Sequence, residues 1–235
     1  MTDINSLLTK EELSTPRTPV ELDQCVKNKG YMFRGNRSAT LHEGLFKEFF
    51  EEVFPLNIFV NHFYKGRADI QCIPNLDRKR DFDAIIVDYS SSPPSEIKVE
   101  ITYARPENEH LRMEYLLEHG YVNAFGKVTS SGTKNTGHKI HAEDKMYSST
   151  DYLEQACSLI QSAVERKSIK LNAPQKYGQG HVLLVAFHEW GLIRSGQAPI
   201  AIKDYVERHV LQLPLNFAAL YVVGLSRQTF LHFVL

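Results

Sequence analysis

The stretch FDAIIVDYSSSPPSEIKVEITY, residues 82–103, contains two β-strand patterns joined by a turn-rich link. The first pattern, FDAIIVD at 82–88, is a short apolar run rich in β-branched residues. The second alternates between apolar and polar side chains at 97–103, with Ile97, Val99, Ile101 and Tyr103 facing one way and Lys98, Glu100 and Thr102 the other. If the two strands pair through the SSSPPS link at 90–95, an acid at the start of the first strand and an acid within the second share one side of a sheet.

The rest of the chain predicts an α/β domain in which a mixed sheet is flanked by helices. Helices are expected at 19–28, 40–53, 107–119, 151–167 and 199–211, and strands at 57–64, 68–73, 82–88, 97–103 and 181–187. The apolar C-terminus reads as two further strands joined by a short turn. We expect a single domain with three parts: an N-terminal helical segment (1–38), an α/β core (39–190), and a C-terminal helix and β-hairpin (191–235) that completes the same domain.

Two local signals support these boundaries. Thr40 and Glu43 have the spacing of a capping box at a helix start, and Pro55 is expected to stop that helix. The Gly-, Ser- and Lys-rich segment at 121–149 predicts a long loop, which in a domain of this size is usually functional or mobile.

Composition narrows the classes of protein. The 27 basic and 28 acidic residues of this 235-residue chain leave a formal net charge of -1, so any surface that attracts nucleic acid must be local. The three cysteines lack the spacing of a zinc site or a disulfide framework. Without a signal sequence or a long apolar run, the expected location is the cytoplasm, with no membrane contact. No P-loop, dinucleotide fingerprint or nucleophile elbow is present.

The chemistry-bearing candidates are Asp83, at the head of the first strand, and Glu100, in the middle of the second. Hydrolysis of a phosphodiester without a covalent intermediate needs a cation that neutralises developing charge and activates water. Mg²⁺ suits this task because one or two carboxylates plus substrate oxygens are enough to hold it. The two strands therefore predict a metal site in outline.

These residues resemble the PD-(D/E)xK, or restriction-endonuclease-like, superfamily of nucleases over roughly residues 40–190. The resemblance rests on the helix with Glu43, on RDFDAIIVD, on KVEIT, on the amphipathic helix ending near Arg166 and Lys167, and on HVLLVAF at 181–187. It implies a restriction-endonuclease-like sheet, Mg²⁺ or Mn²⁺ as cofactor, and Glu43, Asp83 and Glu100 as metal ligands. The partner that it implies is nucleic acid, expected to be DNA.

The chain departs from the family pattern at one position. Thr102 stands where the family has a lysine two residues after the glutamate, so the charge that polarises the attacking water is missing from its usual place. Lys98, on the same strand face, is the first candidate to supply it. Lys139, Lys145 and Arg112 are alternatives that would reach in from elsewhere, and a third possibility is that catalysis has been lost.

Substrate contacts are predicted for Thr102 and for a local set of basic residues. Arg78, Lys79 and Arg80 precede the first strand of the pair, and Lys139 lies in the 121–149 segment; all of them could follow a phosphate backbone. The plainer interpretation is that they are solvated loop charges.

Each acid also has a purely structural interpretation. Glu43 fits a capping box, and Asp69 or Asp81 could take the place of Asp83. Glu100 could simply pair with Lys98 or Arg105.

Three functions follow from the sequence. The first is a metal-dependent nuclease with Asp83, Glu100 and Lys98 as catalytic residues. The second is a catalytically silent nuclease-like module that binds nucleic acid or a partner protein, for instance as a subunit of a larger complex. For the chain in general, a homodimer or a subunit of a larger complex is the expected assembly. The third is an unrelated α/β enzyme whose 121–149 loop covers a small-molecule pocket.

Overall fold

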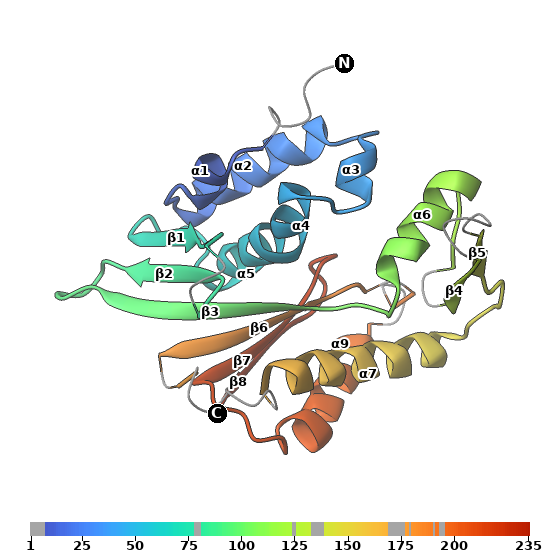
Figure 1. The fold of residues 1–235 in the computed structure, drawn as a ribbon. Helices are drawn as coiled ribbons and strands as arrows, with labels where there is room; N and C mark the ends of the chain where they lie inside the picture. The colour runs from blue at the N-terminus through green and yellow to red at the C-terminus, as the bar shows by residue number, and fades with distance from the viewer. Residues whose placement is uncertain are drawn as a thin grey trace.

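The chain folds around a six-stranded mixed sheet with the strand order β1-β2-β3-β6-β7-β8 (Figure 1). A computed structural model describes residues 8–77, 81–123, 126–132, 139–168, 177–178, 180–189, 191–192 and 196–235. The strands of this sheet are β1 (Ile70–Pro74), β2 (Ala84–Asp88), β3 (Ser95–Ala104), β6 (His181–Phe187), β7 (Ala219–Gly224) and β8 (Phe230–Val234).

The strand directions confirm the predicted pairing of the two central patterns. β1, β2 and β3 form an antiparallel meander in which Ala84 lies opposite Val99. β6 and β7 run parallel to β3, and β8 returns antiparallel to β7. β6 lies between two parallel neighbours, as its continuous apolar sequence predicts. The carboxyl ends of β3, β6 and β7 therefore meet at one edge of the sheet.

Helices cover both faces of the sheet (Figure 1). On one face lie α2 (Pro19–Met32), α4 (Leu45–Glu48), the π-helical turn η2 (Phe49–Val53) and α5 (Phe54–Phe63). On the other face lie α7 (Ser149–Ser168), α9 (Ala198–Tyr205) and a second π-helical turn, η3 (Val206–Val210). Two short helices, α1 (Lys10–Ser14) and α3 (Arg37–Thr40), complete the N-terminal part, and α6 (Glu109–His119) follows β3. In the described ranges, no helix combines the length and the apolar character needed to span a bilayer.

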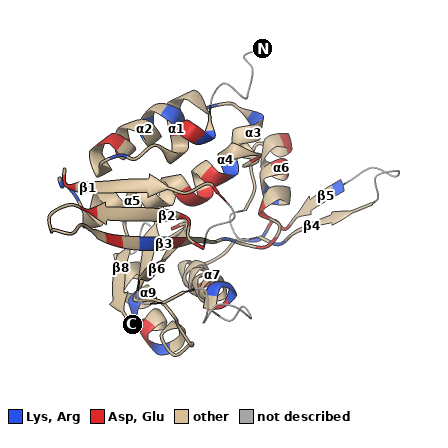
Figure 2. Ribbon diagram, turned by 60° about the vertical axis from the view of Figure 1, so that its left-hand side comes forward, with Lys and Arg blue, Asp and Glu red and all other residues tan. Residues whose placement is uncertain are grey.

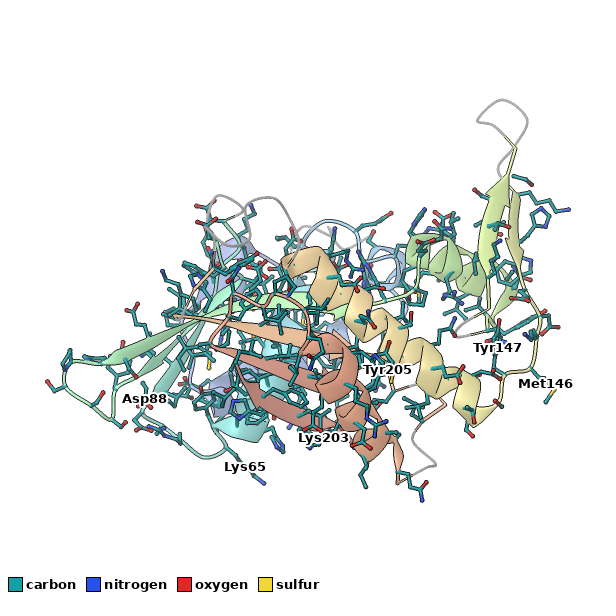
Figure 3. The ribbon with its side chains drawn as sticks, turned by 90° about the horizontal axis from the view of Figure 1, so that it is seen from below. Lys65, Asp88, Met146, Tyr147, Lys203 and Tyr205 are labelled. Carbon is teal, nitrogen blue, oxygen red and sulfur yellow. The ribbon has the colours of Figure 1, made fainter. Side chains whose placement is uncertain are left out.

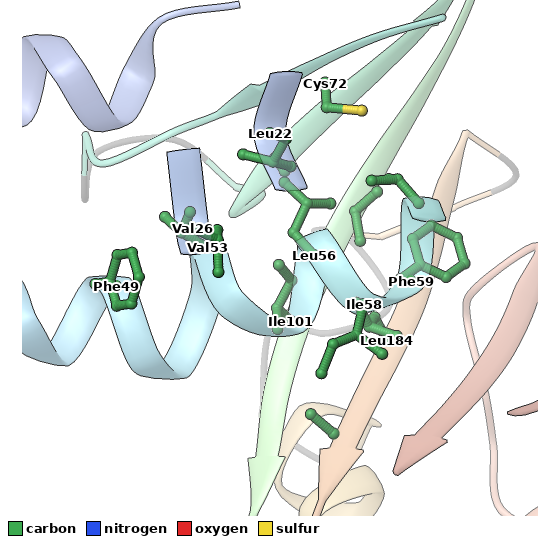
Figure 4. Close-up of a cluster of buried hydrophobic side chains, with 14 of the residues drawn as sticks. Leu22, Val26, Phe49, Val53, Leu56, Ile58, Phe59, Cys72, Ile101 and Leu184 are labelled. Atoms are coloured by element: carbon green, nitrogen blue, oxygen red, sulfur yellow. The ribbon is translucent and has the colours of Figure 1, made fainter. Parts of the chain in front are cut away.

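Two apolar clusters make the core, one on each side of the sheet. The alternation at 97–103 is confirmed, because Val99, Ile101 and Tyr103 belong to the cluster under α5 whereas Ala104 belongs to the cluster under α7. Figure 4 shows the first cluster, in which Leu56 and Ile58 of α5 pack near Ile101 of β3 and Leu184 of β6. Its position leaves the polar face of β3, with Glu100 and Thr102, turned toward α7.

The segment at 40–64 differs from the prediction. The Thr40–Glu43 capping box does not form: Asn36 caps α3, which ends at Thr40, and the next helix begins at Leu45. Pro55 does not stop the helix, and the predicted strand at 57–64 is wrong, since α5 runs from Phe54 to Phe63. A proline ring clashes with the carbonyl four residues earlier. Here the preceding turn is widened to a π-helix, with the Phe54 N–H donating to the Phe49 carbonyl, so the helix continues through the proline.

The 121–149 segment is not one long loop. It contains an antiparallel hairpin, β4 (Val128–Ser131) and β5 (Lys139–Ala142), that forms its own two-stranded sheet. The hairpin projects beside α6 and away from the six-stranded sheet (Figures 1 and 2). Its strands are too short and too polar to show a clear period-2 apolar pattern, which is why the sequence did not reveal them.

Candidate functional site

A pocket of about 760 Å³ opens at the carboxyl end of β3, beside the start of β2. Acidic and basic side chains line it together. Figure 2 shows both signs of charge on α4 and α6, the helices on either side of it. The lining residues are Lys47, Glu51, Glu52, Asp83, Ile101, Thr102, Tyr103, Arg105, Pro106, Glu107, Asn108, Glu109, His110, Arg166 and Lys167.

Asp83 is fixed at the point where β2 begins to pair with β3. Its backbone N–H donates to the Val99 carbonyl at 2.9 Å, and its Oδ2 accepts a hydrogen bond from the Ile101 N–H at 2.7 Å. The carboxylate therefore lies next to the backbone of the residue that follows Glu100.

Glu100 lies on the polar face of β3 and is only 3% exposed. Its Oε1 accepts a hydrogen bond from the Tyr177 hydroxyl at 2.9 Å and forms an ion pair with the Lys167 ammonium. A buried carboxylate without a partner would be strongly unfavourable, so this cation and hydroxyl stabilise its charge. Burial, followed by the charge of Glu100 and then by that of Asp83, raises the pKa of Tyr177. Both acids thus act on the same hydroxyl.

Glu52 is the acid with the most perturbed proton affinity in the pocket. It comes from η2, packed over β3, and its pKa is raised to about 8. The largest cause is burial, and the charges of Asp83, Glu48 and Glu51 add to it, whereas Lys167 acts in the opposite direction. At neutral pH the site therefore holds a carboxyl group whose negative charge is opposed by its neighbours.

The basic lining residues are partly engaged. Arg105 forms an ion pair with Glu51, and Arg166 donates to the Tyr103 carbonyl at 3.3 Å. Lys47 and Arg166 are exposed at the pocket. The pocket thus presents cations at its surface and opposed carboxylates within.

The structure brings together some of the residues that the sequence predicts and separates others. Asp83 and Thr102 line the pocket, and Glu100 forms an ion pair with Lys167, which also lines it. Glu43 is exposed in the turn between α3 and α4 and is not among the described lining residues. The ammonium of Lys98 lies 5.5 Å from the centre of the Phe82 ring, also outside the described lining.

The remaining basic candidates lie elsewhere. Lys139 belongs to strand β5 of the projecting hairpin, and the Lys145 ammonium lies 5.2 Å from the centre of the Tyr147 ring. Arg112 is buried and donates to the Asn123 and Gly126 carbonyls. Arg78, Lys79 and Arg80 lie outside the described residues.

The alternatives for Asp83 also separate. Asp69 is bound by Arg67 at 2.5 Å, at the other end of the sheet's meander. Asp81 is exposed, and its charge adds to the effect of Asp83 on Tyr177. Of the three aspartates, Asp83 is the one in the described lining of the pocket.

Sequence reasoning missed Glu52 and Lys167. Glu52 follows a buried phenylalanine by three residues and precedes the buried Val53, so two adjacent acids in an otherwise apolar helix were the available signal. Lys167 lies in the last turn of the long amphipathic helix α7, where a lysine is also expected simply because it complements the helix dipole.

A divalent cation fits this site through a pair of carboxylates and not through a preformed cage. Within the described ranges, no group of three or more His, Cys, Asp or Glu side chains is placed to hold a metal ion. Glu52 and Asp83 nevertheless line one pocket and repel each other, a repulsion that a cation would relieve. One or two carboxylates are sufficient for Mg²⁺ when water and substrate oxygens supply the other ligands.

Comparison with known proteins adds no assignment to this geometry: no protein-family model, no curated protein and no solved structure matches the chain.

Proposed function

We propose that the chain is a divalent-metal-dependent nuclease that hydrolyses phosphodiester bonds in DNA, with its active site in the pocket at the carboxyl end of β3. The observation that carries the proposal is the raised pKa of Glu52 beside Asp83, in a pocket that Arg166 and Lys167 also line. Phosphodiester hydrolysis requires both a place for a cation and positive charge for the phosphate. The pocket offers both.

Glu52 and Asp83 are the residues that would hold Mg²⁺ or Mn²⁺, with Glu100 close behind. When bound, such an ion neutralises charge on the phosphate and makes a water molecule more acidic. The chain's own contribution begins with Asp83, whose Oδ2 is fixed by the Ile101 N–H so that the carboxylate keeps one orientation. Because its pKa is raised, Glu52 can carry a proton near neutral pH and release it when the local charge changes.

Lys167 takes the part of the lysine that Thr102 replaces. It reaches Glu100 from α7, 65 residues further along the chain than position 102, and it lines the pocket. A cation at this place can stabilise negative charge that develops on a bound phosphate. Tyr177 donates to the same Glu100 oxygen, so it positions the carboxylate against which Lys167 is held.

The test is a cleavage assay on DNA with Mg²⁺ or Mn²⁺, comparing the wild-type chain with Glu52→Gln, Asp83→Asn and Glu43→Gln. The first two variants should lose cleavage by about 100-fold or more, since each replaces a carboxylate that would hold the cation with a neutral amide. Glu43→Gln is the matched control because it removes an exposed glutamate from a neighbouring turn, and it should cleave like wild type. Equal cleavage by Asp83→Asn and wild type, with both folded, would refute the site.

A second candidate is a catalytically silent nucleic-acid-binding or protein-interaction module. The observation that favours it is that Glu100 is already engaged by Lys167 and Tyr177, and that the described ranges contain no group of three or more metal-ligating side chains. This candidate predicts salt-sensitive DNA binding with no turnover in either metal ion. The same assay, run beside a binding measurement, separates the two.

A further inference from the structure

The β4–β5 hairpin is anchored to the rim of the proposed active site. The Asn108 side chain, which lines the pocket, donates to the Val128 carbonyl at 3.2 Å, at the base of the hairpin. Arg112 of α6, only 1% exposed, donates to the Asn123 and Gly126 carbonyls just before β4. A guanidinium buried under one short segment is a strong tether, because breaking these two hydrogen bonds would leave the buried charge with only the Glu109 carboxylate, 3.5 Å from its Nε. The hairpin base is therefore held in place relative to the pocket.

The two faces of the hairpin differ. Directly opposed residues of an antiparallel pair share a face, so the pairs Thr129–His141 and Ser131–Lys139 lie on one side. All four of these residues are exposed, and the Ser131 hydroxyl lies 3.0 Å from His141 Nε2. On the other side, Val128 is buried, and Ile140 and Ala142 are half-buried. The exposed face consists of hydrogen-bonding and basic groups and has no apolar side chain.

The lysines in this stretch of sequence are not matched by acidic residues until Glu143. Between Glu118 and Glu143 the sequence contains no aspartate or glutamate, whereas Lys127, Lys134 and Lys139 all lie in that interval. In a chain with 28 acidic and 27 basic residues, this is a local positive segment without any global positive charge. Glu143, at the hairpin base, accepts hydrogen bonds from the Lys127 N–H and the Tyr147 hydroxyl.

We propose that the β4–β5 hairpin is an arm that enters the major groove of duplex DNA and holds it against the pocket, an inference that rests on the proposed function. The major groove of B-form DNA admits a two-stranded β-ribbon, whereas the major groove of duplex RNA is too deep and narrow for side chains to read. Lys127 and Lys139 would contact phosphates, and Thr129, Ser131 and His141 would face the base edges. The exposed polar face carries Lys127, Lys139 and His141 against one acid, Glu143 at the hairpin base, so it suits this partner, and the opposed pairs on it offer no apolar side chain to a protein.

The test measures binding without catalysis, by fluorescence anisotropy of a short labelled DNA duplex of mixed sequence in EDTA. The variant Lys127→Gln/Lys139→Gln should bind at least about tenfold more weakly, and its log–log salt slope should fall by about 2. The matched control is Lys65→Gln/Lys203→Gln, which removes the same charge from residues that Figure 3 shows on a part of the molecule distant from Tyr147 and the hairpin. The control should bind like wild type. Unlabelled duplex RNA should compete poorly.

The outcomes separate this inference from the proposed function. Duplex binding that depends on the hairpin lysines, with no cleavage in Mg²⁺ or Mn²⁺, would keep the arm and refute the nuclease. Cleavage that depends on Asp83, with both lysine variants binding DNA equally, would keep the nuclease and refute the arm. A preference for single-stranded DNA or for duplex RNA, or hairpin-dependent capture of a protein without DNA binding, would also overturn the arm.

Discussion

Strand β2 has charged clusters at its two ends, and they are built in opposite ways. At its carboxyl end, Asp88 accepts hydrogen bonds from the two terminal guanidinium nitrogens of Arg67, at 2.8 and 3.0 Å, and Arg67 also forms an ion pair with Asp69. Hydrogen bonds from Ser90, together with Arg67, lower the pKa of Asp88 to about 2. Just before its amino end, Asp83 lies near Glu52, and burial plus the neighbouring acids raise the pKa of Glu52 to about 8.

The Arg67 cluster stabilises the fold, whereas the Glu52–Asp83 pair lowers its stability. The Arg67 cluster favours the charged form of its acids, so it supports the fold at neutral pH. The Glu52–Asp83 pair disfavours the charged form, so the fold is weaker wherever both acids ionise. Groups kept in such an unfavourable state are concentrated at functional sites, because a ligand can relieve the repulsion.

The largest expected effect concerns the cation at the pocket. Lys167→Gln should reduce metal-dependent cleavage by about 100-fold or more, because it removes the positive charge nearest Glu100. Lys98→Gln removes the lysine that the sequence favoured and should change cleavage by less than about threefold, since Lys98 lies over Phe82 outside the described lining. Single-turnover rates measure both.

Lys167→Arg separates a catalytic loss from a folding loss. It keeps a cation beside Glu100, so it should fold like wild type and recover part of the cleavage that Lys167→Gln loses. If Lys98→Gln proves the more damaging variant while both remain folded, the lysine assignment is wrong.

The second effect is on stability and its pH dependence. Since the pKa of Glu52 in the folded chain is about 8, above its ordinary value of 4.5, the folded state binds the extra proton and stability falls as pH rises through that window. Glu52→Gln should therefore raise the free energy of unfolding at pH 8 or above by about 2–4 kcal/mol and flatten its decline from pH 5 to 8. Denaturant titrations at several pH values measure this.

Magnesium should act in the same direction as Glu52→Gln. Millimolar Mg²⁺ should raise the Tm of the wild-type chain at pH 8 and should raise that of Glu52→Gln much less, because an ion that binds only the folded state stabilises it. If Mg²⁺ does not change the Tm of either protein, the proposal that Glu52 and Asp83 hold a metal ion is wrong.

The smallest effect belongs to the other end of β2. The pKa of Asp88 is lowered, so its contribution to stability is present above its ordinary pKa of 3.8 and is lost as pH falls toward 2. Asp88→Asn should lower Tm slightly at neutral pH and reduce the steepness of acid unfolding, and it should leave cleavage unchanged. The effect is small because the ion pair is solvent-accessible. A loss of cleavage in this variant would contradict the division between the two ends.

Periodicity was sufficient to predict the sheet but not the helices that cover it near the pocket. The alternation at 97–103 and the apolar run at 181–187 fix β3 and β6, because sheet faces impose a period of two or continuous burial. The apolar stretch at 57–64 fits a strand equally well, since short apolar runs do not distinguish a strand from a buried helix. Pro55 then favoured a helix end at that residue, whereas the helix continues through it to Phe63.

The site was predictable only where strand register determines it. Asp83 and Glu100 could be placed together because the strands that carry them are consecutive and antiparallel. Glu52 and Lys167 reach the same place from helices on opposite faces of the sheet, and no local pattern encodes that meeting. Long-range packing decides it, as it also decides that Glu43 is exposed.

The widened turn at Phe49–Val53 sets how this chain can diverge. A π-helical turn holds one residue more than an α-helical turn, so deleting a single residue there would leave a continuous helix. Because the widened turn accommodates the extra residue locally, the deletion would restore an α-helical turn and would shorten the Phe49–Val53 segment, which carries Glu51 and Glu52. We expect a homologue with such a gap to have lost either the adjacent acids or the aromatic packing of Phe49, and an alignment gap at this turn would mark lineages in which the pocket has changed its chemistry.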